Sequence, residues 1–148
     1  LKNIHNNKWL KTIDCRYKIK RGQGTNMTDI IKKCTGCGLE MTAEQIINDP
    51  SIRPIGMSFI DIDSESAFYF FQHDIENCGT CFVIKIDKFS DLIVEDIPAK
   101  NMKLSKTCSR HCTDIKSLEE CNNNCHNSPY RRFLLNILKK KSDSAVIK

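Results

Sequence analysis

Cysteine spacing constrains the fold of this chain more than any other feature of its sequence. The 148 residues contain nine cysteines, and eight of them fall into four closely spaced pairs, which leaves Cys15 unmatched. The first residues are rich in Lys and Asn and contain no apolar secretory core, so we expect a reducing, cytoplasmic environment. Paired cysteines in such a compartment usually bind metals or take part in redox chemistry.

The two Cys-x2-Cys pairs favour a single tetrahedral metal site. They are Cys34 with Cys37 and Cys78 with Cys81. A two-residue gap lets both thiolates of a tight turn point the same way, and Gly38 after the first pair suits the positive φ of such a turn. Four sulfurs in a tetrahedron are the geometry that Zn²⁺ prefers. The alternatives are a thioredoxin-like dithiol and two unrelated pairs.

Residues 34–38 and 78–81 together resemble the zinc-ribbon and rubredoxin-like class of four-cysteine metal-binding domains. The resemblance covers residues 32–88 and is one of architecture only. It implies two cysteine turns at the ends of β-hairpins. The chain departs from this class because no Pro follows the first cysteine of either pair and because Phe82 stands where Gly is common. The resemblance implies a metal held by Cys34, Cys37, Cys78 and Cys81.

The two Cys-x3-Cys pairs form a second possible four-thiolate set. On a helix, residues four apart share a face with Cβ atoms ~5–6 Å apart, whereas a disulfide needs ~3.5–4.5 Å. Two facing pairs could form two inter-helix disulfides or converge on one metal ion or iron–sulfur cluster, and the expected compartment favours the metal. His111 and His126 could each replace a cysteine, although we expect both to be exposed. The four cysteines are Cys108, Cys112, Cys121 and Cys125.

Local patterns in residues 27–94 predict a small antiparallel β module of the zinc-ribbon kind. A short helix follows the first cysteine pair. Its N-cap is Thr42, Gln45 completes a capping box, and the helix should end near Asn48. We expect His73 to lie at the end of a strand and not to bind a metal. The segments that predict strands are 58–62, 67–71 and 82–86, with a turn at 63–66.

A linker at 95–107 leads to a cysteine-rich helical module at 108–141. Its last part is an amphipathic helix, with Ser128 as the N-cap and Pro129 at the first helical position. Residues 142–148 are expected to fray. Strands followed by helices place the whole chain in the α+β class. The apolar stripe of the last helix consists of Phe133, Leu134, Ile137 and Leu138.

Charge is distributed unevenly along the chain. The net charge is +5, but residues 1–26 hold seven Lys and Arg against one acidic residue, and the rest holds 16 against 17. The cysteine-rich body therefore lacks the basic footprint typical of nucleic-acid binding. We interpret residues 1–26 as a basic tail, and we hypothesise that this tail is a gene-prediction extension before a natural start at Met27. Arg131 and Arg132 are interpreted as solvated charges on the last helix.

The sequence favours a small metal-binding protein that is not an enzyme. A site closed by four protein ligands leaves no coordination position for a substrate, and the sequence has no phosphate-binding loop and no H-E-x-x-H motif. The favoured function is a regulatory or interaction module with structural zinc sites. It would bind a protein partner through its C-terminal helix, and no segment has the length of a membrane span. The alternatives are an iron or iron–sulfur protein that responds to redox state or oxygen, and a thiol–disulfide oxidoreductase.

Overall fold

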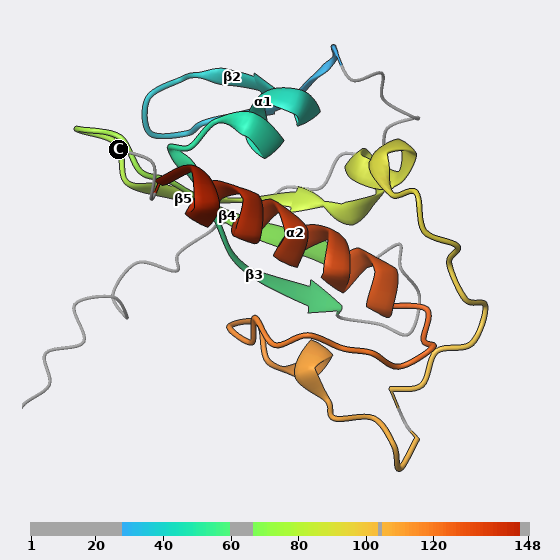
Figure 1. Ribbon diagram of the computed structural model, residues 1–148. Helices are drawn as coiled ribbons and strands as arrows, with labels where there is room; N and C mark the ends of the chain where they lie inside the picture. The colour runs from blue at the N-terminus through green and yellow to red at the C-terminus, as the bar shows by residue number, and fades with distance from the viewer. Residues whose placement is uncertain (1–27, 60–66, 104, 146–148) are drawn as a thin grey trace, which may run out of the picture.

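The computed structural model describes residues 28–59, 67–103 and 105–145. In this part of the chain, two small antiparallel sheets and a long C-terminal helix form a mixed α+β fold (Figure 1), which confirms the predicted class. The predicted tail at 1–26 and the predicted turn at 63–66 lie outside the described residues. None of the described helices combines the length and the apolar character needed to cross a membrane.

The first sheet is a two-stranded hairpin. Strand β1 (Ile30–Lys33) pairs with β2 (Glu40–Thr42), and the loop between them carries the first cysteine pair. Helix α1 (Ala43–Asn48) follows at once, with the predicted capping box. The Gln45 amide donates to the Thr42 hydroxyl at 3.2 Å, and the Thr42 amide donates to the Gln45 side chain at 2.9 Å. These two bonds satisfy amides that a helix start leaves unpaired.

The second sheet has the strand order β3-β4-β5. Its strands are β3 (Ile52–Phe59), β4 (Ala67–His73) and β5 (Thr80–Lys85), all antiparallel to their neighbours. Strand β3 begins earlier than predicted because Pro54 does not end it. Proline is tolerated on an edge strand, and the pairing of β3 shifts register between Pro54 and Gly56.

The outer edge of β3 is covered by the cysteine-rich segment that follows the sheet in sequence. The Met57 amide donates to the Ile115 carbonyl at 3.1 Å. A Cβ atom on Gly56 would lie 2.1 Å from that same carbonyl oxygen, so only glycine lets the two backbones approach this closely. Covering the edge removes a free hydrogen-bonding surface that could otherwise pair with another chain.

Helix α2 (Ser128–Ala145) lies across one face of the second sheet (Figure 1). It begins at Ser128, within a residue of the prediction. Leu134 is fully buried and belongs to the same hydrophobic core as Tyr69 of β4 and Phe89 of the 3₁₀ helix η3 (Ile86–Leu92). The Tyr69 hydroxyl donates to the Tyr130 carbonyl at 2.5 Å. The helix that the sequence places in a second module therefore shares one core with the β strands.

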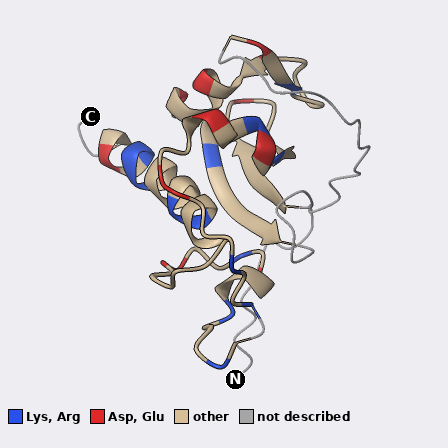
Figure 2. Ribbon diagram, turned by 90° about the vertical axis from the view of Figure 1, so that its right-hand side faces the viewer, with Lys and Arg blue, Asp and Glu red and all other residues tan. Residues whose placement is uncertain are grey.

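Lys141 connects the C-terminal part of α2, through hydrogen bonds, to the end of α1 and the start of β3. Its ammonium group donates to the carbonyl oxygens of Ile46 at 2.6 Å and Asp49 at 2.7 Å, and also to that of Ile52. Burial lowers the pKa of Lys141 to about 8. Lys and Arg recur along α2 (Figure 2). Helix α2 continues to Ala145, into the residues expected to fray, and Lys141 satisfies carbonyls at the end of α1.

Candidate metal centre

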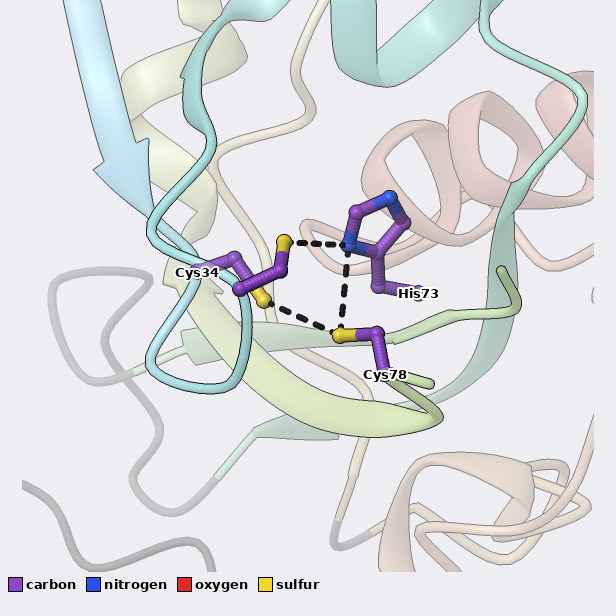
Figure 3. Close-up of side chains that lie close together, drawn as sticks. Cys34, His73 and Cys78 are labelled. Carbon is purple, nitrogen blue, oxygen red and sulfur yellow. Dashed lines mark hydrogen bonds between the residues drawn. The ribbon is translucent and has the colours of Figure 1, made fainter. Parts of the chain in front are cut away.

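Four side chains from two distant parts of the chain meet at one end of the second sheet (Figure 3). Two come from the β1–β2 loop, one from the end of β4 and one from the β4–β5 turn. Their ligand atoms, three sulfurs and one imidazole nitrogen, all lie within 4.8 Å of one another. The residues are Cys34, Cys37, His73 and Cys78.

Three distances inside this group are close to those of a tetrahedral metal site. The sulfurs of Cys34 and Cys78 are 3.5 Å apart. Nδ1 of His73 lies 3.5 Å from the Cys37 sulfur and 3.6 Å from the Cys78 sulfur. Zn–S bonds of about 2.3 Å and a Zn–N bond of about 2.0 Å, set at tetrahedral angles, require S···S of about 3.8 Å and S···N of about 3.5 Å. The group could therefore bind a metal ion.

The β1–β2 loop positions the first two sulfurs. The Cys34 amide donates to the Leu39 carbonyl at 2.8 Å, and the Gly38 amide donates to the Cys34 carbonyl at 2.9 Å. Gly38 has a φ of 77°, as the sequence predicts for the residue after the pair. These two bonds close a tight turn, with Cys34 buried and Cys37 exposed at its surface.

The β4–β5 turn positions the third sulfur. Cys78 stands between Asn77 and Gly79, which both have positive φ angles, 65° and 62°. The Thr80 hydroxyl lies 3.3 Å from the Cys78 sulfur. Its hydrogen bond lowers the pKa of Cys78 to about 6, against the opposing effect of burial. The lowered pKa favours the thiolate of Cys78, and the thiolate is the form that binds metals.

His73 takes the fourth position of the group, and Cys81 is not a member of it. The sheet register explains the difference. His73 is paired with Thr80, and Gln72 is paired with Cys81. Directly paired residues share a face of the sheet and successive residues alternate, so His73 and Thr80 face the site while Cys81 faces the opposite way.

His73 does lie at the end of its strand, as the sequence predicts, and it is only 1% exposed. From the sequence alone we interpret it as a strand-end residue and not as a ligand. The signal that could have found it is its position opposite Thr80, two residues after Cys78. That signal requires the pairing of β4 with β5, which short-range patterns do not supply.

The second set of cysteines lines one small cavity of about 10 Å³, but no three of its sulfurs lie within 4.8 Å of one another. Cys112 lies in a short 3₁₀ helix, η4 (His111–Thr113), and the other three lie in irregular chain, so the predicted helical faces do not form here. His111 also lines this cavity, and His126 is hydrogen-bonded to the Pro98 carbonyl at 2.8 Å. Both histidines are half-buried rather than exposed. The cysteines that line the cavity are Cys108, Cys112, Cys121 and Cys125.

Comparison of the chain with known protein families, with curated proteins and with solved structures finds no match.

Proposed function

We propose that this chain is a small metal-binding protein in which a structural zinc ion is held by the first group. The observation that carries the proposal is the gathering of four ligand atoms within 4.8 Å, from segments far apart in sequence. Three thiolates and one imidazole form one of the common ligand sets of structural zinc. The ligands are Cys34, Cys37, His73 and Cys78.

A structural role follows from the number of protein ligands and from what they connect. Four protein ligands complete a tetrahedron and leave no position for a substrate or an activated water. The ion would join the β1–β2 loop to the β4–β5 turn. Because an isolated two-stranded hairpin is only marginally stable in water, the metal would fix the β1–β2 hairpin onto the second sheet.

The favoured biological role is a regulatory or interaction module whose shape depends on zinc. The apolar stripe of α2 packs on the sheet. A protein partner that binds this helix would therefore meet its polar outer face, where exposed lysines lie. Iron bound by the same thiolates would make the protein a redox or oxygen-responsive one, because thiolate sites accept both metals.

Metal analysis of the anaerobically purified full chain, together with its visible spectrum, tests this proposal. We expect colourless protein with bound zinc. Removal of zinc by a chelator should speed amide hydrogen exchange in residues 30–42 more than in β4. Iron content with a visible thiolate-to-iron band would establish the redox alternative instead. Protein that carries no metal, with exchange unaffected by the chelator, would refute a metal site of either kind.

Cys34→Ser and Thr35→Ala provide a matched pair of variants in the same loop. Cys34→Ser should lose the ion and show fast exchange in the β1–β2 hairpin even in the presence of zinc. Thr35 is exposed and does not belong to the group, so Thr35→Ala should behave as the unmodified chain does.

A further inference from the structure

A buried cation lies beside the second set of cysteines. Arg131, in the first turns of α2, is 0% exposed, although the sequence suggests a solvated charge. Its guanidinium donates to the Glu119 carbonyl at 2.5 Å, to the Ser117 carbonyl at 2.7 Å and to the Ser117 hydroxyl at 3.0 Å. Its remaining nitrogen, Nη1, is buried without a hydrogen-bond partner.

The hydrogen-bond partners of Arg131 are all uncharged. None of the ion pairs formed by the described residues includes it. A buried charge without an opposite charge is strongly unfavourable. The fold therefore calls for a negative group near this guanidinium, in the part of the structure that the cysteine cavity occupies.

The cysteines are the groups able to supply that negative charge. Cys112 lies close enough to Arg131 for a thiolate at this position to interact electrostatically with the guanidinium. Cys112 is also close enough to Cys108, Cys121 and Cys125 to interact electrostatically with each of them. All four line one cavity of about 10 Å³. No three of their sulfurs lie within 4.8 Å of one another, as the ligand atoms of the first group do, so binding an ion requires these sulfurs to move closer together.

Hydrogen-bond donors already point at three of the four sulfurs. The Arg110 amide donates to the Cys108 sulfur at 3.4 Å, and the Met102 amide donates to the Cys125 sulfur at 3.2 Å. Arg110 adopts a left-handed conformation, with a φ of 60°. The Ser128 hydroxyl donates to the Cys121 sulfur at 3.6 Å. Donors to sulfur stabilise thiolates and are typical of the surroundings of metal–thiolate centres.

We propose that Cys108, Cys112, Cys121 and Cys125 form a second structural zinc site, whose negative charge is partly neutralised by the buried guanidinium of Arg131. On binding, the four thiols release four protons to solvent and the ion loses its water ligands. The centre then carries a net charge of −2, which the +1 of Arg131 halves. This site shares no ligand with the first group and does not depend on it.

Two disulfides are the competing product of the same four cysteines. They would be electrically neutral, so Arg131 would stay buried without an opposite charge. Oxidation would also need an electron acceptor, whereas zinc binding needs only the ion. The charge of Arg131 therefore favours zinc over disulfides.

Metal stoichiometry in three variants of the full chain tests the second site separately from the first. Zinc per chain would be measured by native mass spectrometry and elemental analysis for the unmodified protein, Cys34→Ser, Cys121→Ser and the double variant. We expect two zinc ions per chain in the unmodified protein, one in Cys34→Ser, one in Cys121→Ser and none in the double variant. One ion in the unmodified chain that Cys121→Ser leaves in place would overturn the second site alone. An unchanged count in Cys34→Ser would overturn the first site alone.

Cys108→Ser provides a second variant in case Cys121→Ser does not fold, because Cys108 is less buried. It should also lose one ion, while Ser109→Ala, its exposed neighbour, should keep both. Alkylation of the unreduced protein, followed by intact mass measurement, gives an independent readout. In the Cys34→Ser chain, which lacks the first site, four thiols that react only after zinc removal support the second site, and two disulfides in freshly isolated protein would overturn it.

Cobalt binding to the Cys34→Ser chain tests the role of Arg131. In this background only the second site binds, and the sulfur-to-cobalt absorption should have the intensity expected for four thiolates. Adding Arg131→Met should weaken cobalt binding by about tenfold or more and move half-loading to higher pH, while Arg131→Lys should restore part of both. Equal affinity and an equal pH profile in Arg131→Met would overturn the charge-compensating role.

Discussion

Gly36 packs directly against Thr80: a Cβ atom on Gly36 would lie 2.0 Å from the Thr80 hydroxyl oxygen and 3.0 Å from the Cys78 sulfur. These residues belong to the two loops that supply the ligands of the first group. The missing side chain thus lets the loops approach closely enough for their sulfurs to share one ion. Any larger residue must push the β1–β2 loop away from the β4–β5 turn.

Gly36→Ala should therefore weaken zinc binding at the first group and destabilise the protein. Overpacking of this kind typically costs about 1–3 kcal/mol, and the displaced sulfurs should add a loss of metal affinity. Competition with a coloured zinc chelator measures the affinity, and denaturant unfolding measures the stability. Thr35→Ala, in the same loop, should leave both values unchanged. Unaltered zinc affinity in Gly36→Ala would contradict the close contact of the two loops.

Leu134→Ala tests whether α2 and the second sheet share one core. Leu134 is fully buried in that core, and truncation of such a residue usually costs about 2–5 kcal/mol. Chemical denaturation should show this loss in a single transition. The free energy of opening, measured by hydrogen exchange, should fall by the same amount in β4 as in α2. Asn136→Ala, on the exposed side of the helix, serves as the control. If Leu134→Ala left the exchange rates in β4 unchanged, the helix would fold as a separate unit.

The pH dependence of stability should reveal the buried ammonium group of Lys141. Its pKa is about 8 in the folded protein, against an ordinary value of 10.5. Between these pH values the unfolded chain keeps a proton that the folded chain has lost, so the free energy of unfolding rises with pH. Below about pH 8 both states carry the proton and this dependence vanishes.

The measurement compares the unmodified protein with Lys141→Met by denaturant unfolding from pH 7 to pH 10.5. The difference in stability between the two should grow in favour of the unmodified protein as pH rises above about 8. Lys139→Met, an exposed neighbour on the same helix, should show no such change. A difference that stays flat or shrinks over this range would show that Lys141 is not buried as described.

Local sequence patterns predicted the features that depend on neighbouring residues. The capping box of Thr42 and Gln45 is formed, and Gly38 has the positive φ expected after its cysteine. A helix begins at Ser128, and the α+β class is confirmed. Each of these depends on hydrogen bonds or backbone angles within a few residues, which spacing and residue type largely determine.

The features that the sequence did not reveal depend on long-range pairing. The register of β4 with β5 decides that His73, and not Cys81, shares a face with Thr80. Burial of Arg131 results from the packing of α2 against residues 117–119. A histidine outside any cysteine motif and an arginine on an amphipathic helix look ordinary until the tertiary structure places them.

The most direct test of the central claim compares the zinc content of His73→Ala with that of Cys81→Ser. Native mass spectrometry of each full-length variant, over a titration with a zinc chelator, reports the ion held by the first group. We predict that His73→Ala releases this ion at far lower chelator concentration than the unmodified protein, and that Cys81→Ser retains it. Retention by His73→Ala together with loss from Cys81→Ser would contradict the account and assign the site to four cysteines.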